Sequence, residues 1–90
     1  MSLNYKIEFD AFALKQLKSM DKQVSSRITK WLAERVQGCA NPRLWGEALN
    51  GELGEYWRYR IGDYRVICRI EDAKLVVVIT KVGDRKMVYK

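Results

Sequence analysis

Residues 55–81 have the sequence EYWRYRIGDYRVICRIEDAKLVVVITK, in which arginines alternate with bulky apolar residues. Successive side chains of a β-strand point to opposite faces, so this alternation predicts strands with one apolar face and one face that carries guanidinium groups. The dipeptide Gly62-Asp63 suits a hairpin turn, and residues 71–74 suit a second turn. The predicted strands lie at about residues 56–61, 64–70 and 75–82.

The charged face of the predicted hairpin is strongly basic. Arg58 and Arg60 should share one face of the first strand, and Arg65 should point the same way from the second. These two strands contain no acidic residues to compensate the arginines, although like charges across a strand pair are destabilising. Because the guanidinium fork suits bidentate contacts to phosphate, the pattern favours an anion site over a merely solvated face. That hypothesis requires the guanidinium groups to converge without being neutralised by the protein's own carboxylates.

The rest of the chain is expected to cover the apolar face. Residues 5–9 (YKIEF) alternate apolar and polar side chains, which predicts a first strand. Apolar residues then recur at helical spacing over 11–20 and 22–37, behind the N-cap residues Asp10 and Asp21. Residues 41–54, with the only proline and three of the six glycines, are predicted to form a loop.

The resulting element order is β-α-α-β-β-β. It predicts an α+β fold in which an N-terminal helical hairpin packs on one face of a small, mainly antiparallel sheet. The almost continuous β-branched run LVVVITKV is typical of a strand in the sheet interior. With 90 residues, we expect a single domain, 1–90.

The composition of the chain limits the partners, catalytic groups and cofactors that we expect. A net charge of +6 favours a polyanionic partner, either nucleic acid or an acidic protein. The chain has no histidine, so any catalysis must use Arg, Lys, Tyr, Asp or Glu. Cys39 and Cys68 stand in no metal-ligand spacing, so we expect reduced thiols, no metal site and no cofactor. No signal peptide or membrane span is indicated, which predicts a cytoplasmic location.

The basic tail GDRKMVYK (83–90) follows the last predicted strand directly. Arg85 and Tyr89 are four residues apart, a spacing that a helix or turn would place on one side. A tyrosine here could stack on a nucleic-acid base. The alternative interpretation is that Tyr89 simply packs against the protein.

Three stretches together resemble the RelE/ParE toxin superfamily, over essentially the whole chain. They are FDAFALKQLKSMD (9–21), YRIGDYRVICRIED (59–72) and KVGDRKMVYK (81–90). The likeness is to the RelE branch, whose members are toxins that cut messenger RNA in the ribosomal A site. It implies the toxin of a type II toxin–antitoxin system. The alternatives are a ParE-like toxin, which inhibits DNA gyrase without an RNase site, and an inactive RNA-binding remnant.

By position, the resemblance implies that Arg58, Arg60, Arg65, Arg85 and Tyr89 are the catalytic residues. In the family such residues bind the scissile phosphate, stabilise its charge, exchange protons and stack on the base. The implied metal-independent reaction is attack by the RNA 2′-hydroxyl on the adjacent phosphorus, leaving a cyclic phosphate and a free 5′-hydroxyl.

The sequence departs from well-studied members, which carry lysines at the positions of Arg58 and Arg60. Arginine effectively cannot lose a proton, so the general base stays open among Tyr89 as phenolate, Lys86, a water and a ribosomal group. Asn50 stands near where some members carry another basic residue. With no strong conventional base, we expect cleavage to depend on the ribosome fixing the RNA geometry.

The resemblance also implies partners. These are a cognate antitoxin, the ribosome with its messenger RNA, and operator DNA reached indirectly through the antitoxin. The antitoxin is expected to be acidic and to fold as it binds. Its helix could enter a groove beside Phe12, Leu17 and Trp31, or beside Leu44 and Trp45. The favoured interpretation of these residues is that they are core, and they are assigned no site role.

Overall fold

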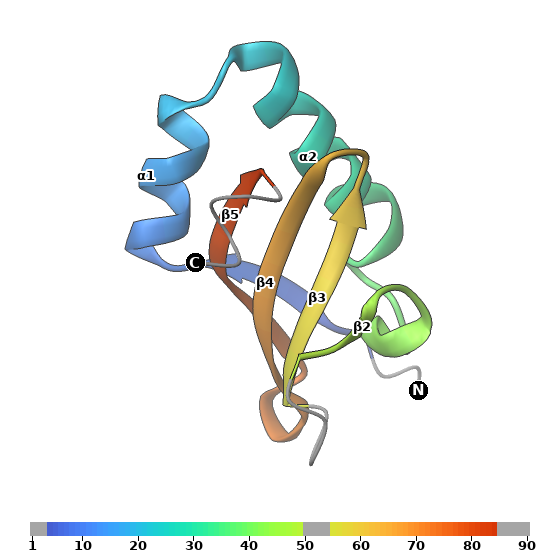
Figure 1. The fold of residues 1–90 in the computed structure, drawn as a ribbon. Helices are drawn as coiled ribbons and strands as arrows, with labels where there is room; N and C mark the ends of the chain where they lie inside the picture. Colours follow the sequence, from blue (N-terminus) through green and yellow to red (C-terminus); the bar gives the residue numbers. More distant parts are fainter. Residues whose placement is uncertain (1–3, 50–54, 85–90) are drawn as a thin grey trace.

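The computed structural model describes residues 4–49 and 55–84. Two helices lie on one side of a five-stranded sheet (Figure 1). The helices span Ala11–Ser19 (α1) and Lys22–Arg35 (α2), and the strands span Lys6–Phe9 (β1), Glu47–Ala48 (β2), Tyr56–Ile61 (β3), Tyr64–Glu71 (β4) and Val76–Asp84 (β5). Asn50, Arg85, Lys86 and Tyr89 lie outside the described residues.

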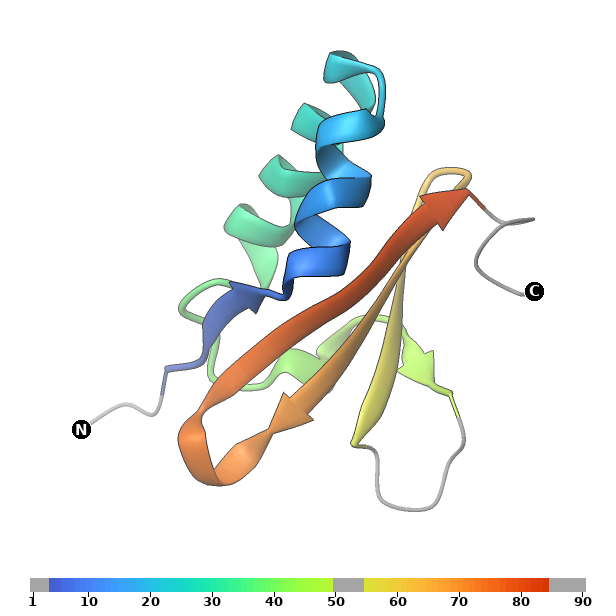
Figure 2. The same cartoon turned by 90° about the vertical axis from the view of Figure 1, so that its left-hand side faces the viewer.

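The strand order in the sheet is β1-β5-β4-β3-β2, with β1 parallel to β5 and the other neighbours antiparallel. Strand β5 therefore lies in the sheet interior, as its β-branched run predicts. Figure 2 shows both helices on the same side of the sheet, which leaves the other side without a described helix. The predicted α+β architecture is confirmed.

The helices begin where their capping residues indicate. The Asp10 carboxylate accepts a hydrogen bond from the Ala13 amide at 2.9 Å, and the Asp21 carboxylate accepts one from the Gln23 amide at 3.2 Å. Helix α2 ends at Arg35, slightly earlier than predicted, and the chain reverses at Gly38 with φ +79°.

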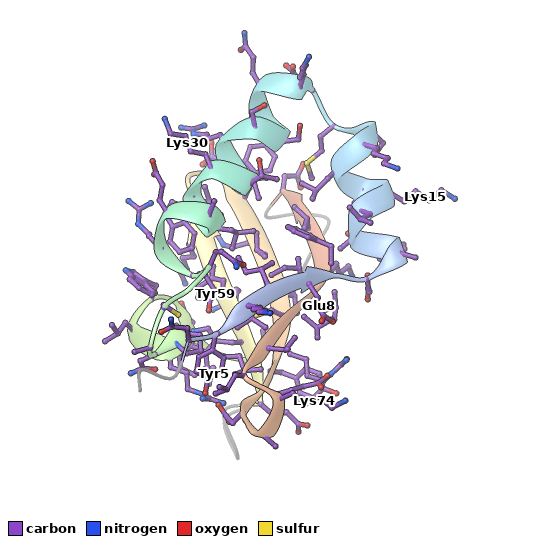
Figure 3. The ribbon with its side chains drawn as sticks, turned by 180° about the vertical axis from the view of Figure 1, so that it is seen from behind. Tyr5, Glu8, Lys15, Lys30, Tyr59 and Lys74 are labelled. Atoms are coloured by element: carbon purple, nitrogen blue, oxygen red, sulfur yellow. The ribbon has the colours of Figure 1, made fainter. Side chains whose placement is uncertain are left out.

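The core lies between the sheet and the helices. Tyr59 of β3 is fully buried beneath α2 (Figure 3), where its ring centroid is 5.4 Å from that of Trp31. The Tyr59 hydroxyl donates a hydrogen bond to the Pro42 carbonyl at 2.6 Å, and burial raises the pKa of this phenol well above its ordinary value. Cys68 is a buried free thiol in the same core, and burial raises its pKa to about 12.

The prediction that residues 41–54 form only a loop was wrong. Pro42–Leu44 form a 3-10 helix, and Glu47–Ala48 form the short edge strand β2, paired with β3. Gly46, immediately before β2, has φ +77°, and a Cβ atom at this position would overlap the carbonyl oxygen of Arg58. Only glycine allows so close a backbone approach, which brings β2 against β3.

Candidate anion-binding site

The register of the sheet brings the predicted arginines onto one face. Arg60 lies directly opposite Arg65 across the β3–β4 hairpin, and Arg58 lies opposite Ile67 on the same face. Lys81 of β5 pairs with Ile67 from the other side and so belongs to this face too. We call this side of the sheet, turned away from α1 and α2, the open face. The register confirms the prediction that Arg58, Arg60 and Arg65 share one face of the sheet.

The expectation that this face lacks compensating acids was wrong. Glu47 of β2 lies opposite Arg58 and makes ion pairs with two arginines at once. Its Oε2 is 2.7 Å from Arg58 Nη2, and its Oε1 is 2.9 Å from Arg60 Nη2. The acid comes from outside the two strands on which the expectation was based. One carboxylate thus pairs with two guanidinium groups and holds them side by side. The requirement that the protein's own carboxylates leave the arginines un-neutralised therefore fails for Arg58 and Arg60.

The arginines bridged by Glu47 differ in exposure. The Arg58 side chain is 12% exposed, whereas those of Arg60 and Glu47 are 56% and 47% exposed. Arg58 is therefore held within the face, while Arg60 and Glu47 are open to a ligand approaching from solvent. A carboxylate between two guanidinium groups occupies the kind of position that a bound phosphate would take.

The environment of Arg65 differs from that of Arg60, because Arg65 is only 9% exposed. Its Nη1 donates hydrogen bonds to the carbonyl oxygens of Gly62 at 3.1 Å and Tyr64 at 3.0 Å, both at the hairpin turn. Among residues 4–49 and 55–84, its buried Nε has no hydrogen-bond partner, and no carboxylate lies within 4.0 Å of its side-chain nitrogens. A buried cation in this setting is costly without a counter-ion, so Arg65 is a fixed positive charge that an anion would compensate.

Further along β4, Arg69 is neutralised locally. Its Nε donates to Glu71 Oε2 at 2.9 Å, and this hydrogen bond holds the pKa of the Glu71 carboxyl below its ordinary value. Arg69 therefore has its own counter-ion and stands apart from the site. The candidate site is confined to the hairpin end of the open face, beside β2.

Of the predicted site residues, Arg58, Arg60 and Arg65 can be placed, whereas Arg85 and Tyr89 lie outside the described residues. Within the described part of the chain, no three metal-binding side chains are grouped so as to hold a metal ion. No helix among these residues is long and apolar enough to cross a membrane. Glu47 was missed because a two-residue strand carries no alternation signal. The preceding Gly46 was the only local hint of a close backbone approach.

Residues 7–89 match the family described as ParE toxin of type II toxin-antitoxin system, parDE. The mRNA interferase toxin RelE of Escherichia coli K12 is 30% identical over 83 residues, which cover 91% of this chain and 84% of RelE.

Solved structures of RelE toxins are also similar to this chain. The isolated E. coli RelE toxin superposes with a TM-score of 0.73 at 28% identity, covering 94% of this chain and 90% of that one. The toxin–antitoxin complex RelBE2 of Mycobacterium tuberculosis gives a TM-score of 0.77 at 24% identity, with 94% and 95% of the two chains covered, and shows the shared fold alone. The chain belongs to the ParE toxin family, within the RelE/ParE superfamily of type II toxin–antitoxin toxins.

Proposed function

We propose that this toxin is a ribosome-dependent endoribonuclease that cuts messenger RNA in the A site. The observation that carries the proposal is the grouping of Arg58, Arg60 and Arg65 at one end of the open face, with Arg65 buried and lacking a carboxylate partner among the described residues. The curated relatives named mRNA interferases support it. Arg85 and Tyr89 complete the proposed site.

The proposed reaction needs negative charge to be stabilised at one phosphodiester. As the RNA 2′-oxygen attacks phosphorus, charge builds up on the non-bridging oxygens, and fixed guanidinium groups stabilise that charge without reorganising. Arg65 suits this role because its hydrogen bonds to the hairpin turn hold it in place. Arg58 and Arg60 clamp the phosphate, Arg85 contacts the phosphate or the leaving oxygen, and Tyr89 stacks on the base.

The ribosome holds the RNA strand in the in-line geometry in this proposal. On the side of the site formed by Arg60 and Glu47, the side chains are 56% and 47% exposed, so this side is open to solvent and leaves the RNA to be positioned by the ribosome. Positioning of this kind accounts for a large part of the rate of intramolecular attack. The free protein is accordingly a poor RNase, and the ribosome-bound transcript is the true substrate.

A cognate antitoxin controls the toxin in this proposal. Solved complexes of RelE with RelB from E. coli and from Pyrococcus horikoshii support such a partner. The basic chain, with a net charge of +6, attracts an acidic antitoxin that folds on binding. Phe12 and Leu44, which are 57% and 69% exposed, supply apolar surface for it. The complex would bind operator DNA through the antitoxin, with the toxin as co-repressor.

A second function is favoured by one observation, the family description itself, which is that of a ParE toxin. A ParE-like toxin would act on DNA gyrase and would not need an RNA site. Expression of the protein separates the two functions. Halted translation with cut transcripts supports the endonuclease, whereas a DNA-damage response with stalled replication supports the gyrase inhibitor.

The direct test uses purified toxin with messenger RNA, either naked or bound to programmed ribosomes. We expect cleavage on ribosomes within a time at which naked RNA stays intact. Equal cleavage of both substrates would refute the ribosome requirement, and intact RNA in both would refute the endonuclease.

A further inference from the structure

Cleavage by 2′-hydroxyl attack needs a group that accepts the 2′-hydroxyl proton. The three placed arginines cannot do this, because a guanidinium has no lone pair available for a proton and effectively never deprotonates. The chain has no histidine. An acceptor must therefore come from another side chain, from water or from the ribosome.

The structure puts one carboxylate inside the arginine cluster. Glu47 contacts both Arg58 and Arg60, one through each carboxylate oxygen, at 2.7 and 2.9 Å. Any phosphate that these two arginines clamp must come within a few ångströms of that carboxylate. The sugar 2′-hydroxyl next to the scissile phosphate is then within reach of a group that can take its proton.

The position of Glu47 is held by the backbone around it. Gly46 packs against the carbonyl of Arg58, and the indole N–H of Trp57 donates a hydrogen bond to the carbonyl of Trp45. On the other side of β2, the amide of Leu49 donates to the carbonyl of Tyr56 at 3.1 Å. A two-residue edge strand fixed from both ends gives its side chain a defined direction. Such fixing is what a catalytic carboxylate requires.

We propose that Glu47 is the general base of the cleavage reaction, an inference that rests on the endonuclease function proposed above. The Glu47 carboxylate takes the proton of the 2′-hydroxyl as the 2′-oxygen forms its bond to phosphorus. The bond from phosphorus to the 5′-oxygen breaks, and that oxygen takes a proton from water. The products are a 2′,3′-cyclic phosphate and a 5′-hydroxyl, and Glu47 then returns its proton to solvent.

Substrate binding itself prepares this base. In the free protein, both oxygens of the Glu47 carboxylate are engaged by Arg58 and Arg60. An arriving phosphate competes for the same guanidinium groups. As they turn toward the phosphate, a carboxylate oxygen becomes available to the 2′-hydroxyl.

The test compares single-turnover cleavage on programmed ribosomes by wild type and by Glu47→Gln. Glutamine keeps a carbonyl oxygen for the arginines but cannot act as a base. We expect the rate to fall by about 100-fold or more, with ribosome binding unchanged, since general bases contribute about 10²–10⁴-fold. Glu34→Gln is the matched control, because Glu34 is an exposed residue of α2 that pairs only with Arg35 among the described residues. Its rate should equal that of wild type.

Two further readouts separate a base from a structural carboxylate. The wild-type rate should rise with pH and level off once the carboxylate is ionised, whereas Glu47→Gln should lose this limb of the profile. In Glu47→Ala, added formate should restore activity and chloride at the same ionic strength should not. Two results would overturn the inference: a Glu47→Gln rate within about threefold of wild type, or a large loss of rate with an unchanged pH profile and no formate rescue. In either case, cleavage by wild type would still support the proposed endonuclease function. Absence of cleavage by wild type overturns both.

Discussion

Gly46 and Arg58 lie so close together that a Cβ atom on Gly46 would overlap the Arg58 carbonyl oxygen. This contact decides where the edge strand β2 runs, and β2 carries the carboxylate that bridges Arg58 and Arg60. The geometry of the candidate site therefore depends on a backbone approach as much as on its charged side chains.

Gly46→Ala should disturb both the site and the fold. The substitution combines a positive φ of +77° with a steric overlap, so we expect a loss of roughly 2–3 kcal/mol in unfolding free energy and a cleavage rate at least about tenfold lower. Gly38→Ala is the control, because Gly38 has φ +79° but open space around its Cβ position. It should cost only about 1 kcal/mol and leave cleavage unchanged. Denaturant unfolding and the ribosome assay measure both effects. Equal behaviour of the two variants would contradict the role assigned to the Gly46 contact.

Arg65→Ala should abolish toxicity while the protein still folds. We expect cleavage to fall by about 100-fold or more, as for loss of one fixed group that stabilises transition-state charge. The stability change should be small, less than about 2 kcal/mol, because two hydrogen bonds are lost together with a buried charge. Arg69→Ala, on the same strand but neutralised by Glu71, should keep its activity. Full growth arrest by Arg65→Ala would show that the site is wrongly assigned.

Arg85→Ala should lower cleavage to a similar extent, because the proposal gives Arg85 a direct contact with the phosphate or the leaving oxygen. Antitoxin binding and the unfolding transition should stay close to those of wild type. The ribosome assay, together with a binding titration of the antitoxin, checks this. If cleavage persists at the wild-type rate, Arg85 has no part in the site.

Asp72 should make the stability of the protein sensitive to acid. Hydrogen bonds from Arg43 at 2.9 and 3.0 Å and from Tyr5 at 2.6 Å hold the pKa of its carboxyl below the ordinary value. A carboxyl with a lowered folded-state pKa stabilises the fold above its unfolded-state pKa of about 4, and this contribution is lost as pH falls through the folded-state value.

Asp72→Asn should therefore be less stable than wild type at pH 7 by about 1 kcal/mol or less, because the side chain is 55% exposed and its ion pair is screened. The gap should narrow as the pH falls below the unfolded-state pKa of about 4. Denaturant unfolding at pH 7 and at a series of pH values below 4 measures it. A gap that is the same at all of these pH values would show that Asp72 contributes no charge-dependent stability.

Much of the fold could be predicted because each main element carries a local signal. The alternation of arginine and apolar residues over β3 and β4 indicated the correct faces, and the register then placed Arg60 opposite Arg65. Asp10 and Asp21 marked both helix starts, since their carboxylates have few other local partners as favourable as the free amides of a helix N-terminus.

The part that could not be predicted depends on contacts between distant residues. Glu47 follows a proline- and glycine-rich stretch, and its strand of two residues has no period to detect. Its ion pairs with Arg58 and Arg60 arise only once β2 has docked on β3. Phe12 and Leu14 fit the apolar spacing of α1 but are largely exposed, because the sheet accommodates only the side of the helix that carries Ala13 and Leu17.

If this toxin cuts messenger RNA through its arginine cluster, the chemical groups at transcript ends mapped after induction will be those that the reaction leaves. Cells expressing wild type should accumulate internal cuts with 2′,3′-cyclic phosphate and 5′-hydroxyl ends. Tyr89→Phe should show whether the phenol contributes more than stacking, because phenylalanine keeps only the ring. We expect the cuts to fall within translated regions and to disappear in Arg65→Ala. Growth arrest with intact transcripts, accompanied by a DNA-damage response, would contradict the proposed function.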